Sequence, residues 1–477
     1  MPDPVASILP KFVAPLEPEF QPAALVNLRF RLQAAPVGVP LVLALERDNG
    51  QISRYESLVF PEGHAQFNEN PAYAERLVKF LLWARGGFKL YVGGPRQIGE
   101  YLRRVYAPDG KRQFDTHFMG GQVYERIFSI ISCDPSEVPA SHEVGKSLGR
   151  HLEGCRVGFD LGASDRKVSA VIDGQAVYSE EVIWEPRQQT DPAYHYRELM
   201  TAIQSAAGKL PRLDAIGGSS AGIIIDNRPM VASLFRGIPR ERFGEIQDLF
   251  LRIQRELGVP VEVLNDGDVT ALAGSMSLED NGVLGIAMGS SEAVGYVDLQ
   301  GNILGWLNEL AFAPVDYHPH APRDDWSRDT GVGSQYFSQQ CVFRLAPRAG
   351  IELPSGIPDA EKLKAVQALL EAGHAGAEKI WQSMGIFLGY GLAHYADFYA
   401  IRHVLILGRC TSGRGGDLIL EGARAVLCGE FPHLAETLQV QLPDEHSRRV
   451  GQSIAAASLP AIPIHHHDRR PNGSNGG

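Results

Sequence analysis

Apolar positions in the first third of the chain alternate between strand-like and helix-like spacing. A proline-rich start over residues 1–22 predicts an extended arm. Val26, Leu28 and Phe30 then alternate with polar residues, as in a half-buried strand. Further strands are predicted at 41–45, 52–60 and 88–92, helices at 73–83 and 95–105, and a turn at 48–50. The pattern therefore predicts a mixed α/β N-terminal domain over residues 23–150.

Beyond residue 150 the pattern changes to alternating strands and helices, which is typical of a larger α/β protein. The predicted strands are 157–161, 168–172, 177–183, 213–216, 261–264 and 404–407, and the predicted helices are 194–208, 241–257, 359–372, 377–400 and 452–458. The polar, glycine-rich residues 463–477 predict a disordered tail, so His465 to His467 are expected to be solvated.

A glycine turn between two strands provides the first candidate chemistry. Asp160 lies at the mouth of the turn, which contains Gly162, Ser164 and Lys167. Backbone N–H groups, a hydroxyl and a cation can bind phosphate oxygens, while a carboxylate holds a hydrated Mg²⁺ beside them. An ordinary β-hairpin with a polar turn explains the same residues.

A second segment repeats this arrangement. Residues 285–301 align without a gap on residues 158–174, placing Gly289 on Gly162 and Ser291 on Ser164. Ala287 stands where Asp160 does, so the second copy lacks the acid. Two glycine-turn hairpins at one offset indicate a duplicated unit in which both halves bind phosphates and one holds the metal.

A carboxylate also follows the strand predicted at 261–264. Asn265 and Asp266 come directly before a helix predicted to start near Val269. Orphan N–H groups at a helix start fix such a side chain. We expect Asp268 to be the N-cap, which leaves Asp266 free to face a cleft.

Residues 155–460 resemble the ROK family of sugar kinases and regulators, within the actin-like ATPase superfamily. The resemblance rests on 160–167 as a first phosphate motif, 289–295 as a second, 265–273 around a catalytic Asp, and Asn308-Glu309 at the sugar site. It implies two ribonuclease H-like lobes around a cleft, over 151–265 with a return helix at 450–461 and over 266–449. The implied ligands are ATP and Mg²⁺, with Asp266 as the base and Asp160 holding the metal.

The resemblance extends to residues that contact ligands. It implies phosphate contacts from Gly162, Ser164, Lys167, Gly289, Ser290 and Ser291, adenosine contacts from Gly408, Gly415 and Gly416, and substrate contacts from Ser219, Ser220, Gly222, Asn265 and Glu309. For the glycines near 217–222 and 408–416, simple turns explain the residues equally well.

The sequence departs from the family where zinc is bound. Phe312 replaces a histidine, Val332 a cysteine and Ser334 a sugar-binding glutamate. Structural zinc needs about four nitrogen or sulfur ligands, so we expect no zinc site. These changes leave hexose specificity open.

Composition limits the partners. The net charge of -11, without a basic block, argues against nucleic acid, and we expect no membrane partner and a cytoplasmic protein. Five widely spaced cysteines are typical of reduced thiols.

The expected function is an ATP-dependent sugar or polyol kinase, with an inactive sugar or nucleotide sensor as the alternative. For residues 1–150 a lid, an oligomerisation surface that would make a homodimer, and a structural appendage remain open.

Overall fold

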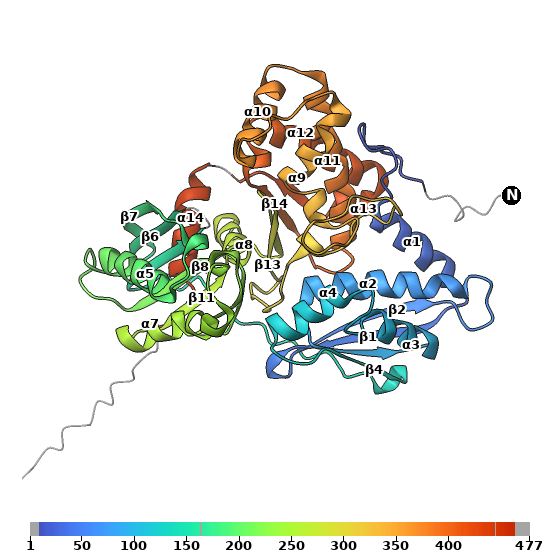
Figure 1. Cartoon of the computed structure of the whole chain (residues 1–477), viewed down its shortest axis with the longest axis horizontal. Helices are drawn as coiled ribbons and strands as arrows, with labels where there is room; N and C mark the ends of the chain where they lie inside the picture. Colours follow the sequence, from blue (N-terminus) through green and yellow to red (C-terminus); the bar gives the residue numbers. More distant parts are fainter. Residues whose placement is uncertain (1–8, 163–164, 444, 463–477) are drawn as a thin grey trace, which may run out of the picture.

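The computed structural model describes residues 9–162, 165–443 and 445–462. Figure 1 shows three parts: the N-terminal domain in blue to cyan, a first lobe in green and a second lobe in yellow to red. Each part is built on its own β-sheet.

The sheet of the first lobe has the strand order β11-β8-β5-β6-β7. Strands β5, β6 and β7 form an antiparallel meander, and β8 and β11 continue the sheet in parallel from β5. A small hairpin, β9–β10, follows β8. The elements are β5 (Cys155–Leu161), β6 (Asp165–Ile172), β7 (Gln175–Ile183), α5 (Pro192–Ala207), β8 (Ala215–Ser220), β9 (Ile223–Ile225), β10 (Arg228–Val231), α6 (Phe243–Gln247), α7 (Leu249–Leu257) and β11 (Val261–Asn265).

The second lobe repeats this plan with one fewer strand in its meander. Its sheet has the order β13-β12-β14-β15, with β12 and β13 antiparallel and β14 and β15 parallel to β12. The hairpins β5–β6 and β12–β13 therefore occupy equivalent positions, as the sequence repeat predicts. The elements are α8 (Asp266–Leu278), β12 (Val283–Met288), β13 (Glu292–Val297), α9 (Gln339–Leu345), α10 (Asp359–Glu371), α11 (Ala375–Tyr395), β14 (His403–Leu407), α12 (Arg414–Glu430), α13 (Pro432–Ala435) and β15 (Gln439–Gln441). The last helix, α14 (Glu445–Ala457), returns to the first lobe and packs on β5, β6 and β8.

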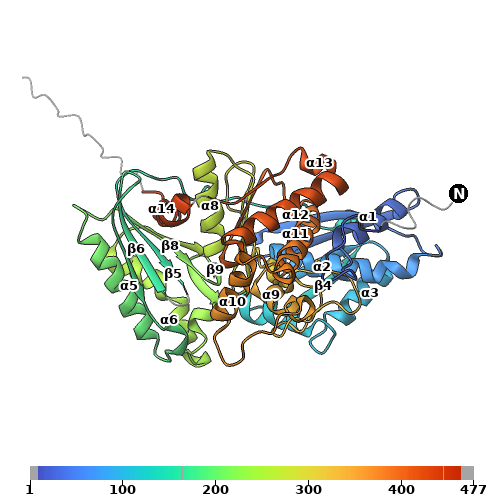
Figure 2. The same cartoon turned by 90° about the horizontal axis from the view of Figure 1, so that it is seen from above.

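Helices α8 and α14 pack together between the two sheets (Figures 1 and 2). Glycines permit this close approach. A side chain at Gly217 would overlap the Ala456 carbonyl on α14, and one at Gly295 would overlap the Gly267 carbonyl on α8. Helix α8, whose first residue is Asp266, therefore packs against both α14 and the second-lobe sheet.

The N-terminal domain has the sheet order β2-β1-β3-β4, with β3 and β4 parallel and the other pairs antiparallel. Its elements are α1 (Ala23–Ala34), β1 (Val39–Glu46), β2 (Ile52–Val59), α2 (Asn70–Arg85), β3 (Lys89–Gly93), α3 (Arg96–Val105), α4 (Gln113–Thr116) and β4 (Ser129–Cys133).

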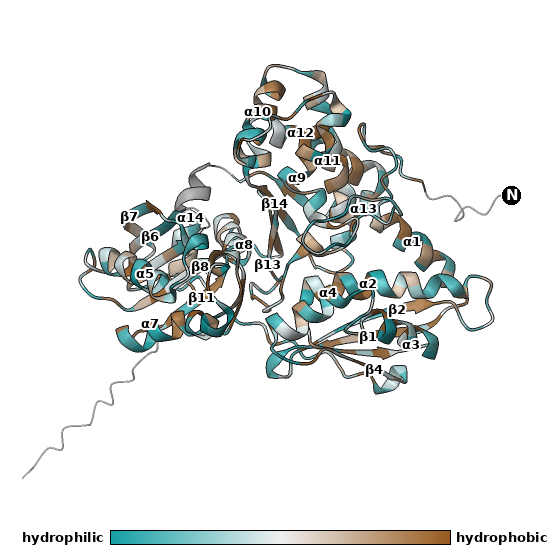
Figure 3. Cartoon of the chain, viewed as in Figure 1, coloured by the Kyte–Doolittle hydropathy of each residue, from teal (hydrophilic) through white to brown (hydrophobic). Residues whose placement is uncertain are grey.

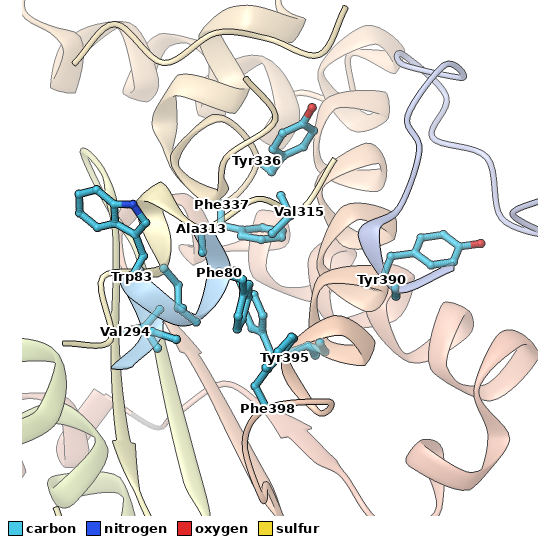
Figure 4. Packing of buried hydrophobic residues seen from close by; sticks show 14 of the residues in the cluster. Phe80, Trp83, Val294, Ala313, Val315, Tyr336, Phe337, Tyr390, Tyr395 and Phe398 are labelled. Atoms are coloured by element: carbon cyan, nitrogen blue, oxygen red, sulfur yellow. The ribbon is translucent and has the colours of Figure 1, made fainter. Parts of the chain in front are cut away.

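One hydrophobic core joins this domain to the second lobe. Phe80 on α2 stacks on Phe398, with ring centroids 4.0 Å apart, and meets His394 of α11 edge to face. Figure 4 shows Phe80 beside Tyr395 and Phe398 in this core, with Trp83 farther away on the other side of Phe80. The described part of the arm, residues 9–22, also lies on the second lobe, where Phe20 packs against Phe387. The N-terminal domain is therefore fixed to the second lobe.

Several of its contacts with the first lobe are polar; some are exposed, and one, between Gln247 and Glu125, is partly buried. Asn49 donates to Asp226 over 3.1 Å, and Lys146 pairs with the same carboxylate at 2.8 Å. Figure 3 shows apolar residues along β1, β14 and α11, with many polar residues on the outer helix α5. None of the helices in the described residues is long and apolar enough to cross a membrane.

Several local predictions were wrong. Residues 26–30 lie in helix α1, because the buried positions Ala23, Asn27, Phe30 and Ala34 follow helical spacing. The helix predicted at 241–257 breaks at Asp248 into α6 and α7. Residues 217–220 continue strand β8 rather than forming a loop, and Lys167 lies in strand β6 rather than in the turn. The tail 463–477 lies outside the described residues.

Candidate functional site

Asp266 lies where β11 ends and α8 begins. The Asn265 side chain caps the helix by accepting the Gly267 N–H over 2.7 Å. The prediction that Asp268 is the N-cap was wrong. Asp268 is buried further along the first turn of α8, where it accepts bonds from the Tyr296 N–H and the Asn308 amide. Asp266 itself keeps partial exposure.

Asp160 lies on the neighbouring part of the first-lobe sheet. It pairs in register with Lys167 on β6 and with Ser219 on β8. The Ser219 hydroxyl donates to its carboxylate over 2.6 Å. Burial raises the pKa of Asp160, while Ser219 and the charge of Lys167 act against that rise.

Acidic side chains converge near the start of α8. Burial and the charge of Asp160 raise the pKa of Asp266 to about 6. Burial and the charges of Asp266 and Asp268 raise the pKa of Glu309 to about 7. Burial likewise raises the pKa of Asp268 to about 7. Electrostatic interactions thus connect three of the predicted residues: Asp160, Asp266 and Glu309.

The other predicted substrate residues have different surroundings. Ser219 and Ser220 are fully buried, and Ser219 supports Asp160 directly. The Asn265 amide donates to the Gly222 carbonyl over 2.8 Å while its oxygen caps α8, so both of its polar atoms have partners in the protein. Gly222 has a φ of 108°, which favours glycine.

Each hairpin turn is closed by a bond from its glycine N–H, but the acceptor lies three residues further along in the first turn and two residues further along in the second. The Gly162 N–H donates to the Asp165 carbonyl over 2.9 Å, and the Gly289 N–H donates to the Ser291 carbonyl over 3.0 Å. Ser290 and Ser291 are both exposed at the second turn. Lys167 has a side chain 43% exposed, 3.5 Å from Asp165. Ser164 lies outside the described residues.

A cavity of about 250 Å³ lies between α8, the end of β14 and α14. Thr270, Leu407 and Gln452 are among its lining residues. Gln452 also donates to Ser219 over 3.4 Å, so the cavity adjoins the support of Asp160. Gly408 follows β14 with a φ of 101°. Gly415 and Gly416 are buried in the first turn of α12, where Gly415 packs on Trp381.

The sequence matches no family model, and no curated protein matches it significantly. Solved structures do match. A ROK hexokinase from Thermus thermophilus is 18% identical, with a TM-score of 0.50, over 64% of this chain and 98% of the hexokinase. A ROK family transcriptional regulator, a homologue of the E. coli MLC protein, is 17% identical, with a TM-score of 0.51, over 65% of this chain and 79% of the regulator. The chain has the fold of the ROK proteins. The predicted two-lobe, actin-like architecture is confirmed.

Within this ROK fold, sequence reasoning missed Glu292. It lies at the start of β13, 3% exposed, where its Oε1 accepts the Tyr395 hydroxyl and its Oε2 has no partner among the described residues. Burial and the charge of Glu309 raise the pKa of Glu292 to about 8, so it is mostly protonated at neutral pH. The sequence around Glu292 contains no local signal that this side chain points into the core, since a glutamate beside a turn is expected to be exposed.

The loop that departs from the family pattern is held by the N-terminal domain. Asp329 pairs with Arg112 at 2.7 Å, with Arg76 at 3.2 Å and with Lys79 at 3.5 Å. These cations lower the pKa of Asp329 against the opposing effect of burial. Phe312 packs between Trp83 and Trp326, with ring centroids 4.7 Å from each. Among the described residues, no three His, Cys, Asp or Glu side chains are arranged to hold a metal ion.

Proposed function

We propose that the protein is an ATP- and Mg²⁺-dependent kinase that phosphorylates a hydroxyl of a sugar or related polyol. The observation that carries this proposal is Asp266: a carboxylate at the start of α8, partly exposed, with a pKa raised to about 6. A base for a hydroxyl proton works best when its pKa is near the working pH. At pH 7 most Asp266 is ionised and can accept that proton.

Asp160 fits the role of a Mg²⁺ ligand. Mg²⁺ prefers carboxylate oxygens and keeps several waters, so one or two carboxylates and the substrate phosphates suffice. Negative charge is concentrated here, since the charge of Asp160 raises the pKa of Asp266. A divalent cation relieves that repulsion and, when bound with nucleotide, neutralises charge on the transferring phosphoryl group. The hydrogen bond from Ser219 orients the Asp160 carboxylate.

The remaining groups bind and orient ligands in this proposal. The N–H and hydroxyl groups near Gly289, Ser290 and Ser291 bind phosphate oxygens, opposite the turn at Gly162. The cavity beside Leu407 accepts the nucleoside. Glu309, with its raised pKa, hydrogen-bonds a substrate hydroxyl next to Asp266. Closure of the two lobes excludes water, which would otherwise compete for the phosphoryl group.

A sensor that binds sugar or nucleotide without turnover is the second candidate. Glu292 favours it, because a buried, protonated glutamate directly follows the second glycine turn, with Ser290 and Ser291 before it. Retention of both Asp160 and Asp266 favours the kinase, because a binding protein gains nothing from a desolvated base.

A screen of sugars, amino sugars and polyols for ADP release tests the two candidates. We expect one class of compound to cause ADP release when ATP and Mg²⁺ are present, and we expect no ADP release when EDTA is added. Calorimetric binding of the same compounds without any turnover would support the sensor and refute the kinase.

A further inference from the structure

The end of helix α2 contacts the predicted substrate residues directly. The last four carbonyls of an α-helix lack partners within the helix. In α2 the Ala84 carbonyl accepts the Asn308 N–H, and the Trp83 carbonyl accepts the Glu309 N–H, both over 3.0 Å. The N-terminal domain thus supplies the acceptors that fix the backbone of Glu309.

The Asn308 side chain connects the end of α2 to helix α8. It is 4% exposed, and its amide donates to Asp268 over 3.0 Å while its oxygen accepts the Tyr399 hydroxyl over 3.0 Å. Asp268 lies two residues after Asp266 on the same helical turn. Asn308 has a φ of 53°, so the backbone there adopts the left-handed conformation that asparagine and glycine tolerate best.

The end of α2 is itself held firmly. Arg85, which is buried, donates to the Phe398 carbonyl and lies over the Trp306 ring, 3.1 Å from its centroid, and over the Tyr399 ring at 4.9 Å. Earlier on the same helix, Lys79 pairs with Asp115 at 2.6 Å. A cation is attracted to the face of an aromatic ring, and loss of one partner of a buried ion pair is costly, so both contacts hold α2 in place.

We propose that the end of α2 positions the substrate site and that Asn308 is a positioning residue, which fixes Glu309 relative to Asp266 through its bond to Asp268. This role rests on the proposed kinase function for its kinetic consequence. The N-terminal domain then forms the wall behind the substrate-binding edge of the second lobe. It acts through hydrogen bonds to that edge rather than by contacting substrate.

The kinetic test is Asn308→Gly, which preserves the left-handed backbone and both backbone bonds but removes the amide. We expect KM for the best substrate to rise about tenfold or more, with Mg·ATP affinity unchanged. Asn49→Gly is the matched control, because Asn49 also has a positive φ, of 58°, and makes one exposed bond to Asp226. It should behave as wild type. An unchanged KM in Asn308→Gly, or equal loss of nucleotide affinity, would overturn the positioning role.

An activity-independent test uses hydrogen–deuterium exchange. In wild type the amides of Asn308 and Glu309 should exchange slowly, and Arg85→Met should speed exchange in peptides spanning 306–312 while leaving 155–161 unchanged. If these changes occur and no compound is phosphorylated, the positioning stands and the kinase proposal fails. Fast exchange in wild-type 306–312, or no effect of Arg85→Met, would refute the positioning whatever the turnover.

Discussion

Replacing Asp266 by Asn should remove activity and stabilise the fold. The pKa of Asp266 is raised from 3.8 to about 6, so ionisation costs folding free energy. A difference of about two units corresponds to about 3 kcal/mol. Because the side chain keeps some exposure, water reduces this, and we expect a gain of roughly 1–2 kcal/mol at pH 7. Asparagine preserves the shape and the bond to the Gly267 N–H.

The pH dependence of this stabilisation follows from the linkage between proton binding and folding. A carboxyl whose folded pKa is raised contributes stability below its unfolded pKa, and that contribution is lost as pH rises through about 6. The stabilisation by Asp266→Asn should therefore disappear near pH 4 and be full above pH 7. Urea denaturation at both pH values measures it.

Turnover should respond in the opposite direction. Without a proton acceptor the rate of phosphoryl transfer should fall roughly a hundredfold or more, while binding of substrate and nucleotide changes little. For the wild type, kcat/KM measured at a subsaturating Mg²⁺ concentration should decline as the pH falls below about 6. Unimpaired turnover in Asp266→Asn, or a variant less stable than wild type at pH 7, would contradict the assignment of Asp266 as a desolvated base.

Two further variants, with a third as a control, test other parts of the molecule. Asp160→Ala should abolish Mg²⁺-dependent nucleotide binding in calorimetry with little change in melting temperature; normal Mg·ATP binding would exclude the metal role. Asp329→Ala leaves Arg112, Arg76 and Lys79 without a shared carboxylate and should destabilise the protein by roughly 3–5 kcal/mol. Asp397→Ala, which breaks the more exposed pair with Arg31, should cost about 1 kcal/mol or less, and equal losses for both variants would contradict the buried-network argument.

The sequence predicted the parts of the fold that repeat. The hairpins at Asp160 and Ala287, the strand before Asp266 and the helices α5, α10 and α11 lie close to where the repeat and the periodicity placed them, because their signals are local. It failed at α1, where alanines and Asn27 form much of the buried face and the larger apolar residues happen to alternate. It also failed at Asp268, since a cap and a buried acceptor look alike until Tyr296 and Asn308 are brought to it from distant segments.

The contacts of the N-terminal domain with the candidate site could not be predicted from the sequence for the same reason. Nothing near Trp83 or Ala84 indicates that their carbonyls face Asn308 and Glu309, which lie far along the chain in another lobe. The ion pairs of Asp329 with Arg76, Lys79 and Arg112 likewise join residues that only the folded topology brings together.

The core shared by α2 and the second lobe affects how the protein is made. Phe80 and Trp83 leave the ribosome roughly 300 residues before Phe398, which covers Phe80 in the finished core. At about 5–20 residues per second, this aromatic face waits roughly 15–60 seconds for its partner. During that interval the nascent N-terminal domain presents an uncovered apolar surface, so synthesis of this chain should depend on chaperones that bind such surfaces early.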